Sequence, residues 1–212
     1  MACEFSGIVR DAFAARGHEA WSCDLLPSER PGPHLPCDAL SVLDQGWDLI
    51  IAHPECRYLN HAGVRWLYEG GRRWNKDGSE NPRDPERWAA MESAAEFFNK
   101  ILDVPCPLIA AENSETHPYA VELVGRKADQ VIQPWQFGHG EVKATHLWLK
   151  NLPLLTATNI VEGRKPRVHH ESPGPDRWKN RSRTMAGVAS AMAEQWGHSP
   201  QVNQPGARGR NG

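Results

Sequence analysis

The sequence lacks long apolar runs, closely spaced cysteines and internal repeats. No stretch of about 18 consecutive apolar residues occurs and no leader pattern opens the chain, so we expect neither a membrane span nor a secretion signal. The five cysteines are odd in number and include no Cys-x-x-Cys pair. That pattern argues against a disulfide framework and for a reducing compartment. Together these absences predict a cytoplasmic protein.

Tryptophan is abundant, and charge is unevenly distributed. Nine tryptophans are many for 212 residues, and several of them lie in polar, basic stretches. The formal net charge is only −2, yet residues 151–212 carry nine Lys and Arg against four Asp and Glu, whereas residues 1–150 carry 15 against 22. An acidic body with a basic C-terminal segment suits a protein that meets a polyanion on one side, although a solvated surface has the same composition.

Short apolar runs alternate with helical patterns along the chain. This alternation predicts an α/β fold with a mostly parallel sheet flanked by helices, in a single domain over residues 1–198. Within it, residues 63–87 are expected to form an inserted loop and 153–183 a short basic segment, and 199–212 a disordered tail. Strand-like runs cover residues 2–5, 20–23, 47–52, 107–111, 131–137 and 145–149, and helical spacing covers 9–15, the stretch after Pro85, and 186–196.

Polar residues follow four of these strand-like runs. They are Phe5-Ser6-Gly7, Asp24, the stretch His53–Cys56, and Glu112-Asn113. Because ligands of parallel α/β sheets bind beyond the carboxyl ends of the strands, these four clusters are the candidate site.

Two of the four clusters contain residues suited to covalent and acid–base chemistry. Cys56 follows a proline in a polar loop, where free backbone N–H groups and Arg57 would favour a nucleophilic thiolate. Glu112 follows a buried strand, and at that depth we expect a raised pKa that would let it donate a proton to a heterocycle nitrogen. A Glu that merely bonds to nearby backbone is the alternative.

The other two clusters resemble nucleotide-binding features. Gly7 opens the first helix, whose N-terminal N–H groups could meet a ligand carboxylate. Asp24 ends the second strand and could accept both hydroxyls of a ribose, and Asp38 in the third loop could meet an adenine amino group. A tight turn and helix N-caps are the structural alternatives at these positions.

Taken in order, these motifs resemble those of the carbon-5 cytosine-specific DNA methyltransferases. That family has Phe-x-Gly at the first strand, an acid after the second, Asp in the third loop, Pro-Cys after the fourth and Glu-Asn after the fifth. The chain also resembles the short methylase-like proteins of phages and prophages. That likeness is carried by ACEFSGIVRDAF, DLIIAHPEC, IQPWQFG, KATHLWLKNLP and RSRTMAGVASAMAEQWG.

The resemblance implies a Rossmann-like fold that binds S-adenosylmethionine and transfers its methyl group to cytosine in DNA, in a bacterial host or a phage-infected cell. Cys56 would attack carbon 6 of the base, Glu112 would support the charge change at ring nitrogen 3, and the base would be flipped out of the duplex. Lys143 lies where the family has a basic catalytic element. The implied cofactor-binding residues are Phe5, Ser6, Gly7, Asp24, Asp38, Pro54 and Asn113.

The chain departs from the family at the nucleophile and in size. It reads Pro54-Glu55-Cys56-Arg57 where the family has Pro-Pro-Cys-Gln, and only a short basic segment stands where a long recognition region is usual. So little recognition surface implies a short or relaxed target site, or help from an accessory protein or a homodimer. The candidate DNA-binding residues are Arg57, Arg72, Arg73, Arg164, Lys165, Arg167, Arg177, Lys179 and Arg181.

Three other interpretations stay open. A zinc-dependent nucleobase deaminase would use His53-Pro54-Glu55 as its His-x-Glu, but that chemistry also needs Pro-Cys-x-x-Cys. A metal cluster could be drawn from His34, Cys37, His53, Cys56 and His61, with no established zinc spacing. A non-catalytic relative would bind DNA or cofactor only, and a related enzyme would transfer a modified group or act on a modified acceptor.

Overall fold

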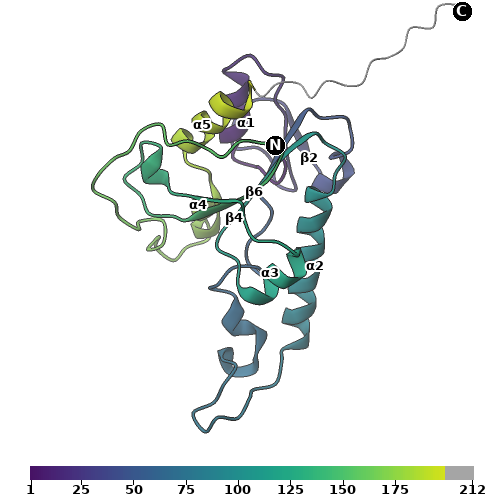
Figure 1. The fold of residues 1–212 in the computed structure, drawn as a ribbon, viewed down its shortest axis with the longest axis vertical. Helices are drawn as coiled ribbons and strands as arrows, with labels where there is room; N and C mark the ends of the chain where they lie inside the picture. Colours follow the sequence, from purple (N-terminus) through teal and green to yellow (C-terminus); the bar gives the residue numbers. More distant parts are fainter. Residues whose placement is uncertain (199–212) are drawn as a thin grey trace, which may run out of the picture.

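The computed structural model describes residues 1–198 and consists of one central sheet with helices on both faces (Figure 1). The tail predicted for 199–212 lies outside the described residues. The helices are α1 Ile8–Ala14, α2 Pro85–Leu102, α3 Pro118–Val124, α4 Arg177–Ser182 and α5 Ala186–Trp196, with short 3-10 helices at Ala39–Ser41, Val64–Leu67, Glu69–Gly71 and Pro134–Gln136. The strands are β1 Ser22–Asp24, β2 His34–Pro36, β3 Leu49–Ala52, β4 Leu108–Asn113, β5 Gln130–Ile132 and β6 Thr145–Lys150.

The N-terminal residues join the strands into one sheet. Ala2 forms parallel bridges with Cys23 of β1 and with Ala52 of β3, so the first residues of the chain act as a strand between them. The spatial order is therefore β2, β1, the N-terminal strand, β3, β4, β6, β5. The chain starts in the middle, moves outward to β2, and then returns to build the other half from β3. The strand order thus reverses between the N-terminal strand and β3.

The sheet is mixed rather than uniformly parallel. Parallel pairing holds for β1 with β2 and for β3 with β4, as the sequence predicts, whereas β6 is antiparallel to both β4 and β5. The strand expected over 131–137 ends at Ile132, because Pro134 cannot donate a ladder hydrogen bond and begins a 3-10 helix instead. The sequence analysis also missed the short elements β2, α3 and α4.

The alternation of side chains along the central strands builds a core on each face of the sheet. Ala110 of β4 faces the layer of α1 and α5, with Val9, Phe13 and Met192, whereas its neighbour Ala111 faces the layer of α2 and α3. In that second layer, the ring of Phe98 lies 4.9 Å from that of Trp148, edge to face at 76°.

The predicted insert extends away from this body. Residues between β3 and α2 form the lower end of the molecule in Figure 1, and they contain two short 3-10 helices and a few bridges rather than long strands. Helix α2 begins directly after it, with Asp84 as N-cap accepting from the Arg87 N–H and Pro85 at the first position. In residues 1–198 no helix is long and apolar enough to cross a membrane.

A buried arginine holds the loop that follows β1. The Arg10 side chain is 1% exposed, and its guanidinium donates to Ser22 and Ser28 hydroxyls, to the carbonyls of residues 30 and 31, and to Asp11. Gly32, with φ of 137°, lies so close that a Cβ there would be 2.8 Å from the Arg10 Cζ. Arg10 therefore links helix α1 to strand β1 and to the loop that follows this strand.

Replacing Arg10 by Met is expected to lower the free energy of unfolding by about 3–5 kcal/mol, because several buried acceptors lose their donor together. Denaturant titration measures this. Arg16→Met is the control, since Arg16 pairs with the exposed Glu194 and should cost less than about 1 kcal/mol. Equal losses in the two variants would contradict the role given to Arg10.

Candidate active site

The ends of four strands bring the predicted clusters to one edge of the sheet. Parallel strands end at the same edge, so the segments after the N-terminal strand, β1, β3 and β4 all lie there. Because β6 is antiparallel, the residues that precede it, including Lys143, reach the same edge. In open α/β sheets the crevice for a ligand opens where the strand order reverses, here between the N-terminal strand and β3.

Glu112, near the end of β4, joins three segments of this edge. Its Oε2 lies 2.8 Å from His53 Nδ1 and accepts a hydrogen bond from the Thr184 hydroxyl at 3.2 Å. The side chains of His53 and Glu112 are only 11% and 12% exposed. Lys143 is near enough to act on the carboxylate electrostatically. Glu112 is therefore the centre of a largely buried polar network.

The predicted raised pKa of Glu112 is wrong. Burial does raise it, but the hydrogen bond from His53 and the positive charges of His53 and Lys143, helped by Thr184, outweigh that effect and lower the pKa to about 2. The prediction considered only the burial of the strand end and not the hydrogen-bond donors that the fold places beside Glu112. In this structure Glu112 is a carboxylate that accepts hydrogen bonds.

His53 and Thr184 are site residues that sequence reasoning did not identify in these roles. His53 entered only as a candidate metal ligand, and Thr184 was not considered. The signal for His53 was available in part, because it precedes Pro54 directly at the end of β3. Nothing local marks Thr184, which lies 72 positions from Glu112 and meets it through the packing of the segment between α4 and α5.

Cys56 lies in the loop that these contacts anchor. The Asn113 amide donates to the Pro54 carbonyl at 3.3 Å, and with the His53 contact it ties the loop to β4 on two sides. Cys56 is half-buried, and the Asn60 amide lies 3.7 Å from its Sγ. Three residues span at most about 10 Å, so the Cα of Cys56 lies within that distance of the Cα of His53, which contacts Glu112. Its neighbour Glu55 is exposed.

The end of the first strand differs from the prediction in one respect. Glu4, 4% exposed, accepts from the N–H groups of Val9 and Arg10 at 2.8 and 3.3 Å, and Ser6 Oγ accepts from that of Ile8. The N-terminus of α1 is therefore already occupied by a carboxylate of the chain itself, and the expectation that it offers free donors to a ligand is wrong. Gly7 has φ of 69°, the left-handed region that favours glycine.

The two predicted acids lie at the ends of β1 and β2. Asp24 is half-buried and accepts from the Leu26 N–H at 2.9 Å, and burial raises its pKa although that hydrogen bond and His34 oppose the shift. Asp38 is exposed and caps a 3-10 helix by accepting from the Leu40 N–H. The helix-cap alternative thus holds for Asp38, while one oxygen of the Asp24 carboxylate keeps no side-chain or backbone donor within residues 1–198.

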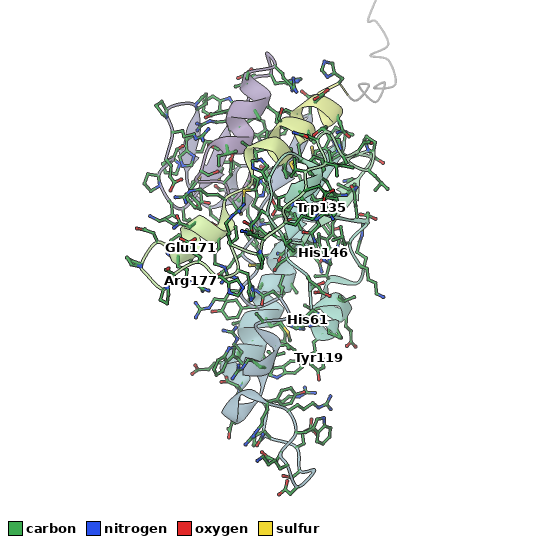
Figure 2. The ribbon with its side chains drawn as sticks, turned by 90° about the vertical axis from the view of Figure 1, so that its left-hand side faces the viewer. His61, Tyr119, Trp135, His146, Glu171 and Arg177 are labelled. Carbon is green, nitrogen blue, oxygen red and sulfur yellow. The ribbon has the colours of Figure 1, made fainter. Side chains whose placement is uncertain are left out.

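The basic segment lies against the site rather than apart from it. The ring of Trp178 in α4 packs at 5.9 Å from that of Phe5, and Arg183 forms two hydrogen bonds to Glu29, at 2.7 and 2.6 Å. Figure 2 views this side of the molecule, with Glu171 and Arg177 of the segment beside the column of Trp135, His146 and His61. The segment between β6 and α5 therefore covers part of the crevice.

The predicted DNA-binding cations divide into two groups. Several are engaged within the chain: Arg73 pairs with Glu80, Arg167 with Glu141 and Lys179 with Asp176, Arg164 stacks on Trp135, and Arg177 bonds to the carbonyls of residues 169 and 171. The others make no ion pair in the described part of the chain: Arg57, Arg72, Lys165 and Arg181.

A groove of about 600 Å³ adjoins the Cys56 loop. Arg57 and Asn60 line it from the loop side, and Trp66, Tyr68 and Arg87 line it from the insert and α2. Trp66 is 52% exposed and carries the Arg65 guanidinium over its ring at 4.6 Å. Another cavity, of about 420 Å³, lies at the opposite edge of the sheet near Asn151 and has no connection with these residues.

The geometry does not support the metal cluster of the deaminase interpretation. Both ring nitrogens of His34 are engaged, by Ser22 Oγ and by the Leu26 carbonyl, each at 2.9 Å. His53 Nδ1 is held by Glu112. Among residues 1–198, no three His, Cys, Asp or Glu side chains are grouped so that they could hold a metal ion.

Glu112 should make the free energy of unfolding depend on pH in the acidic range. Its pKa in the folded state lies near 2, below the ordinary 4.5, so its contribution is present above pH 4.5 and is lost as the pH falls toward 2. We expect the free energy of unfolding to drop by something on the order of 3 kcal/mol over that window, and Glu112→Gln to remove this drop. Denaturant titration at a series of pH values measures this drop. The control is Glu96→Gln, which alters an exposed ion pair on α2 and should leave the pH dependence of the wild type unchanged.

Comparisons with known proteins give little to set beside this geometry. The sequence matches no protein-family model and no curated protein. Among solved structures, it is similar to a crystal structure described as a candidate DNA modification methyltransferase encoded within an E. coli prophage, with 15% identity and a TM-score of 0.41. The match covers 74% of this chain and 50% of that chain, so the chain spans half the length of that protein. At this level the similarity supports no argument about function.

Proposed function

We propose that this chain is a DNA methyltransferase that transfers a methyl group from S-adenosylmethionine to carbon 5 of cytosine, with Cys56 as the nucleophile. The observation that carries the proposal is the meeting of the Cys56 loop, Glu112 and Lys143 where the strand order reverses. That is where an α/β sheet binds its ligand. The motif order found in the sequence points to the same chemistry and to a Rossmann-like methyltransferase fold.

The residues at the crevice suit the nucleoside half of the cofactor. Asp24 offers a carboxylate oxygen for ribose hydroxyls, and the buried Phe5 and Pro54, at the ends of the N-terminal strand and β3, would form the floor of the pocket. The amino-acid half would be held away from the N-terminus of α1, because Glu4 occupies that position. Asp38 and Asn113 would shape the pocket, Asn113 by fixing Pro54. When bound, the sulfonium supplies an electrophilic methyl group.

Cys56 and Glu112 would have different roles at the base, Cys56 as nucleophile and Glu112 as the group that contacts the ring edge. Carbon 5 of cytosine is a poor nucleophile, and addition of the Cys56 sulfur to carbon 6 gives the ring the electron density that carbon 5 needs. The Asn60 amide near Sγ favours negative charge on the sulfur. Glu112 would meet the pyrimidine edge and Lys143 would balance its charge. After transfer, loss of the proton from carbon 5 expels Cys56.

The surface around the crevice fits a flipped base and its flanking strand. Extruding a base costs a few kcal/mol, which contacts to the backbone and neighbouring bases must offset. Arg57 and Trp66 in the groove beside Cys56 offer a cation and a stacking face, and Lys165 and Arg181 offer charge from the other side. We place this activity in the cytoplasm of a bacterial host or a phage-infected cell.

The direct test incubates the protein with cytosine-containing duplex DNA and methyl-labelled S-adenosylmethionine. We expect label at carbon 5 of cytosine, and a loss of roughly 10³-fold or more for Cys56→Ser, because the weaker hydroxyl nucleophile stops addition. Cys106→Ser is the matched control, since Cys106 is buried before β4 at the other edge and a hydroxyl can keep its contacts to carbonyls. Duplex with 5-fluorocytosine should trap wild type, but not Cys56→Ser, as a covalent adduct.

Cofactor or DNA binding without transfer or adduct would instead identify a non-catalytic relative. Label on another atom or another acceptor would identify the related-transfer alternative. Either result would contradict the assignment to carbon 5 of cytosine.

DNA binding should depend on the cations that make no ion pair within residues 1–198. Each phosphate contact contributes about 0.9 to the slope of log K against log salt concentration, so replacing Arg72, Lys165 and Arg181 together by Gln should reduce that slope by roughly 2–3. Fluorescence anisotropy over a salt series measures it. The control, with Arg16, Lys100 and Lys127 replaced by Gln, removes equal charge from the opposite edge of the sheet and should keep the wild-type slope.

A further inference from the structure

The imidazole of His53 is held in an unusual way for a residue with a purely structural role. Nδ1 lies 2.8 Å from the Glu112 carboxylate, while Nε2 is fully buried and has no hydrogen-bond partner within residues 1–198. A buried polar atom without a hydrogen-bond partner destabilises the folded state. The imidazole is therefore held through one nitrogen, Nδ1, by its contact with Glu112.

Within residues 1–198, the Glu112 carboxylate that His53 contacts takes part in hydrogen bonds through one oxygen only. Both His53 and Thr184 meet Oε2, and in the described part of the chain no donor is bonded to Oε1. Lys143 is the other charged group that acts on this carboxylate, and its Nζ lies 3.5 Å from the Arg183 carbonyl. Oε1 is therefore the oxygen left for a substrate, while Oε2 is held by the protein.

We propose that His53 is the proton store for Glu112: it supplies the proton that Glu112 passes to the cytosine ring and takes it back when the product forms. This inference rests on the proposed function. His53 acts through Glu112 and is a positioning and proton-supplying residue, while Cys56 and Glu112 contact the base.

The proton balance is as follows. In the free protein the proton is on His53 Nδ1, and Glu112 is ionised. As the Cys56 sulfur bonds to carbon 6, negative charge develops at ring nitrogen 3. The N–H bond at Nδ1 breaks as its proton passes to Oε2 of Glu112, leaving neutral imidazole, and the carboxyl group turns about its Cγ–Cδ bond to bring this O–H to ring nitrogen 3, where the O–H bond breaks. When carbon 5 loses its proton to solvent and the bond between sulfur and carbon 6 breaks, ring nitrogen 3 returns its proton through Glu112 to His53.

This arrangement accounts for how a carboxylate with a pKa near 2 can serve as a proton donor. Alone, such a group would hardly ever be protonated near neutral pH. Beside an imidazolium at 2.8 Å it needs no proton of its own, because the donor proton is held one hydrogen bond away. The usual pKa of histidine, about 6.5, is far better suited to this exchange than that of the carboxylate.

The first test compares methyl transfer by His53→Asn and wild type across a range of pH. Asn retains an N–H donor near the position of Nδ1, so the fold and the bond to Glu112 are kept while the titrating proton is removed. We expect a loss of about 100-fold at pH 8. The pKa of Glu112 should rise without the cation, so the ratio of variant to wild-type rate should climb, by up to about tenfold per unit, as the pH falls through the acidic range in which an imidazole stays protonated.

A constant ratio across pH would overturn the proposal, because a structural role lowers the rate equally at every pH. His146→Gln is the control; His146 lies half-buried at the same edge, paired in register with Asn113 and without a bond to Glu112, and its ratio should stay flat. If His53→Asn does not fold, judged by its thermal unfolding, His53→Gln takes its place.

The second test does not depend on catalysis, so it separates this proposal from the proposed function. Infrared difference spectra on acidification report when Glu112 becomes a carboxylic acid, and the signal is assigned by its absence in Glu112→Gln. We expect the signal to appear at a clearly higher pH in His53→Asn than in wild type. The same onset in both proteins would overturn the proton-store role. That shift together with absence of methyl transfer by wild type would mean that the pair works as described but that the acceptor is wrong.

Discussion

The hydrogen bond between His53 and Glu112 connects the two halves of the sheet's functional edge. It joins the residue after β3 to the end of β4, and a second bond, from Asn113 to the Pro54 carbonyl, fixes the same loop. Because both groups are largely buried, this contact is little weakened by solvent. The position of the Cys56 loop, the ionisation of Glu112 and the path of the segment that contains Thr184 all depend on it.

This contact is possible because of the strand order. The N-terminal strand lies between β1 and β3, so the chain must cross back over the sheet, and the crossing opens a crevice at the carboxyl ends. The antiparallel β6 adds to it by bringing Lys143 to the same edge. Arg10 then closes the loop after β1 onto α1. The site is thus assembled from segments that follow the N-terminal strand, β1, β3 and β4 and that precede β6 and α5.

In the proposed function, the segment between β6 and α5 would both cover the crevice and contact DNA. Its Trp178 packs on Phe5 and its Arg183 bonds to Glu29, which anchors it across the crevice, while Lys165 and Arg181 form no ion pair with any other described residue. A segment used both to cover a pocket and to meet a polyanion can be short, because the same contacts that order it also orient its charges. This explains how about thirty residues could stand in for a longer recognition region.

The sequence by itself determined the elements whose signals are local. Apolar runs identified β3 and β4, Pro85 and a helical stripe identified α2, and the short polar motifs at strand ends identified Cys56 and Glu112 as residues that belong to one edge. These succeed because burial pattern, proline and strand ends act over a few residues. Only the tertiary structure decided the rest: that β6 runs antiparallel, that Glu4 occupies the N-terminus of α1, and that His53 and Thr184 lower the pKa of Glu112 instead of leaving burial to raise it. The physical reason is that a buried carboxylate takes its properties from whichever donors packing brings within 3 Å or so, and those donors lie 59 and 72 positions away along the chain.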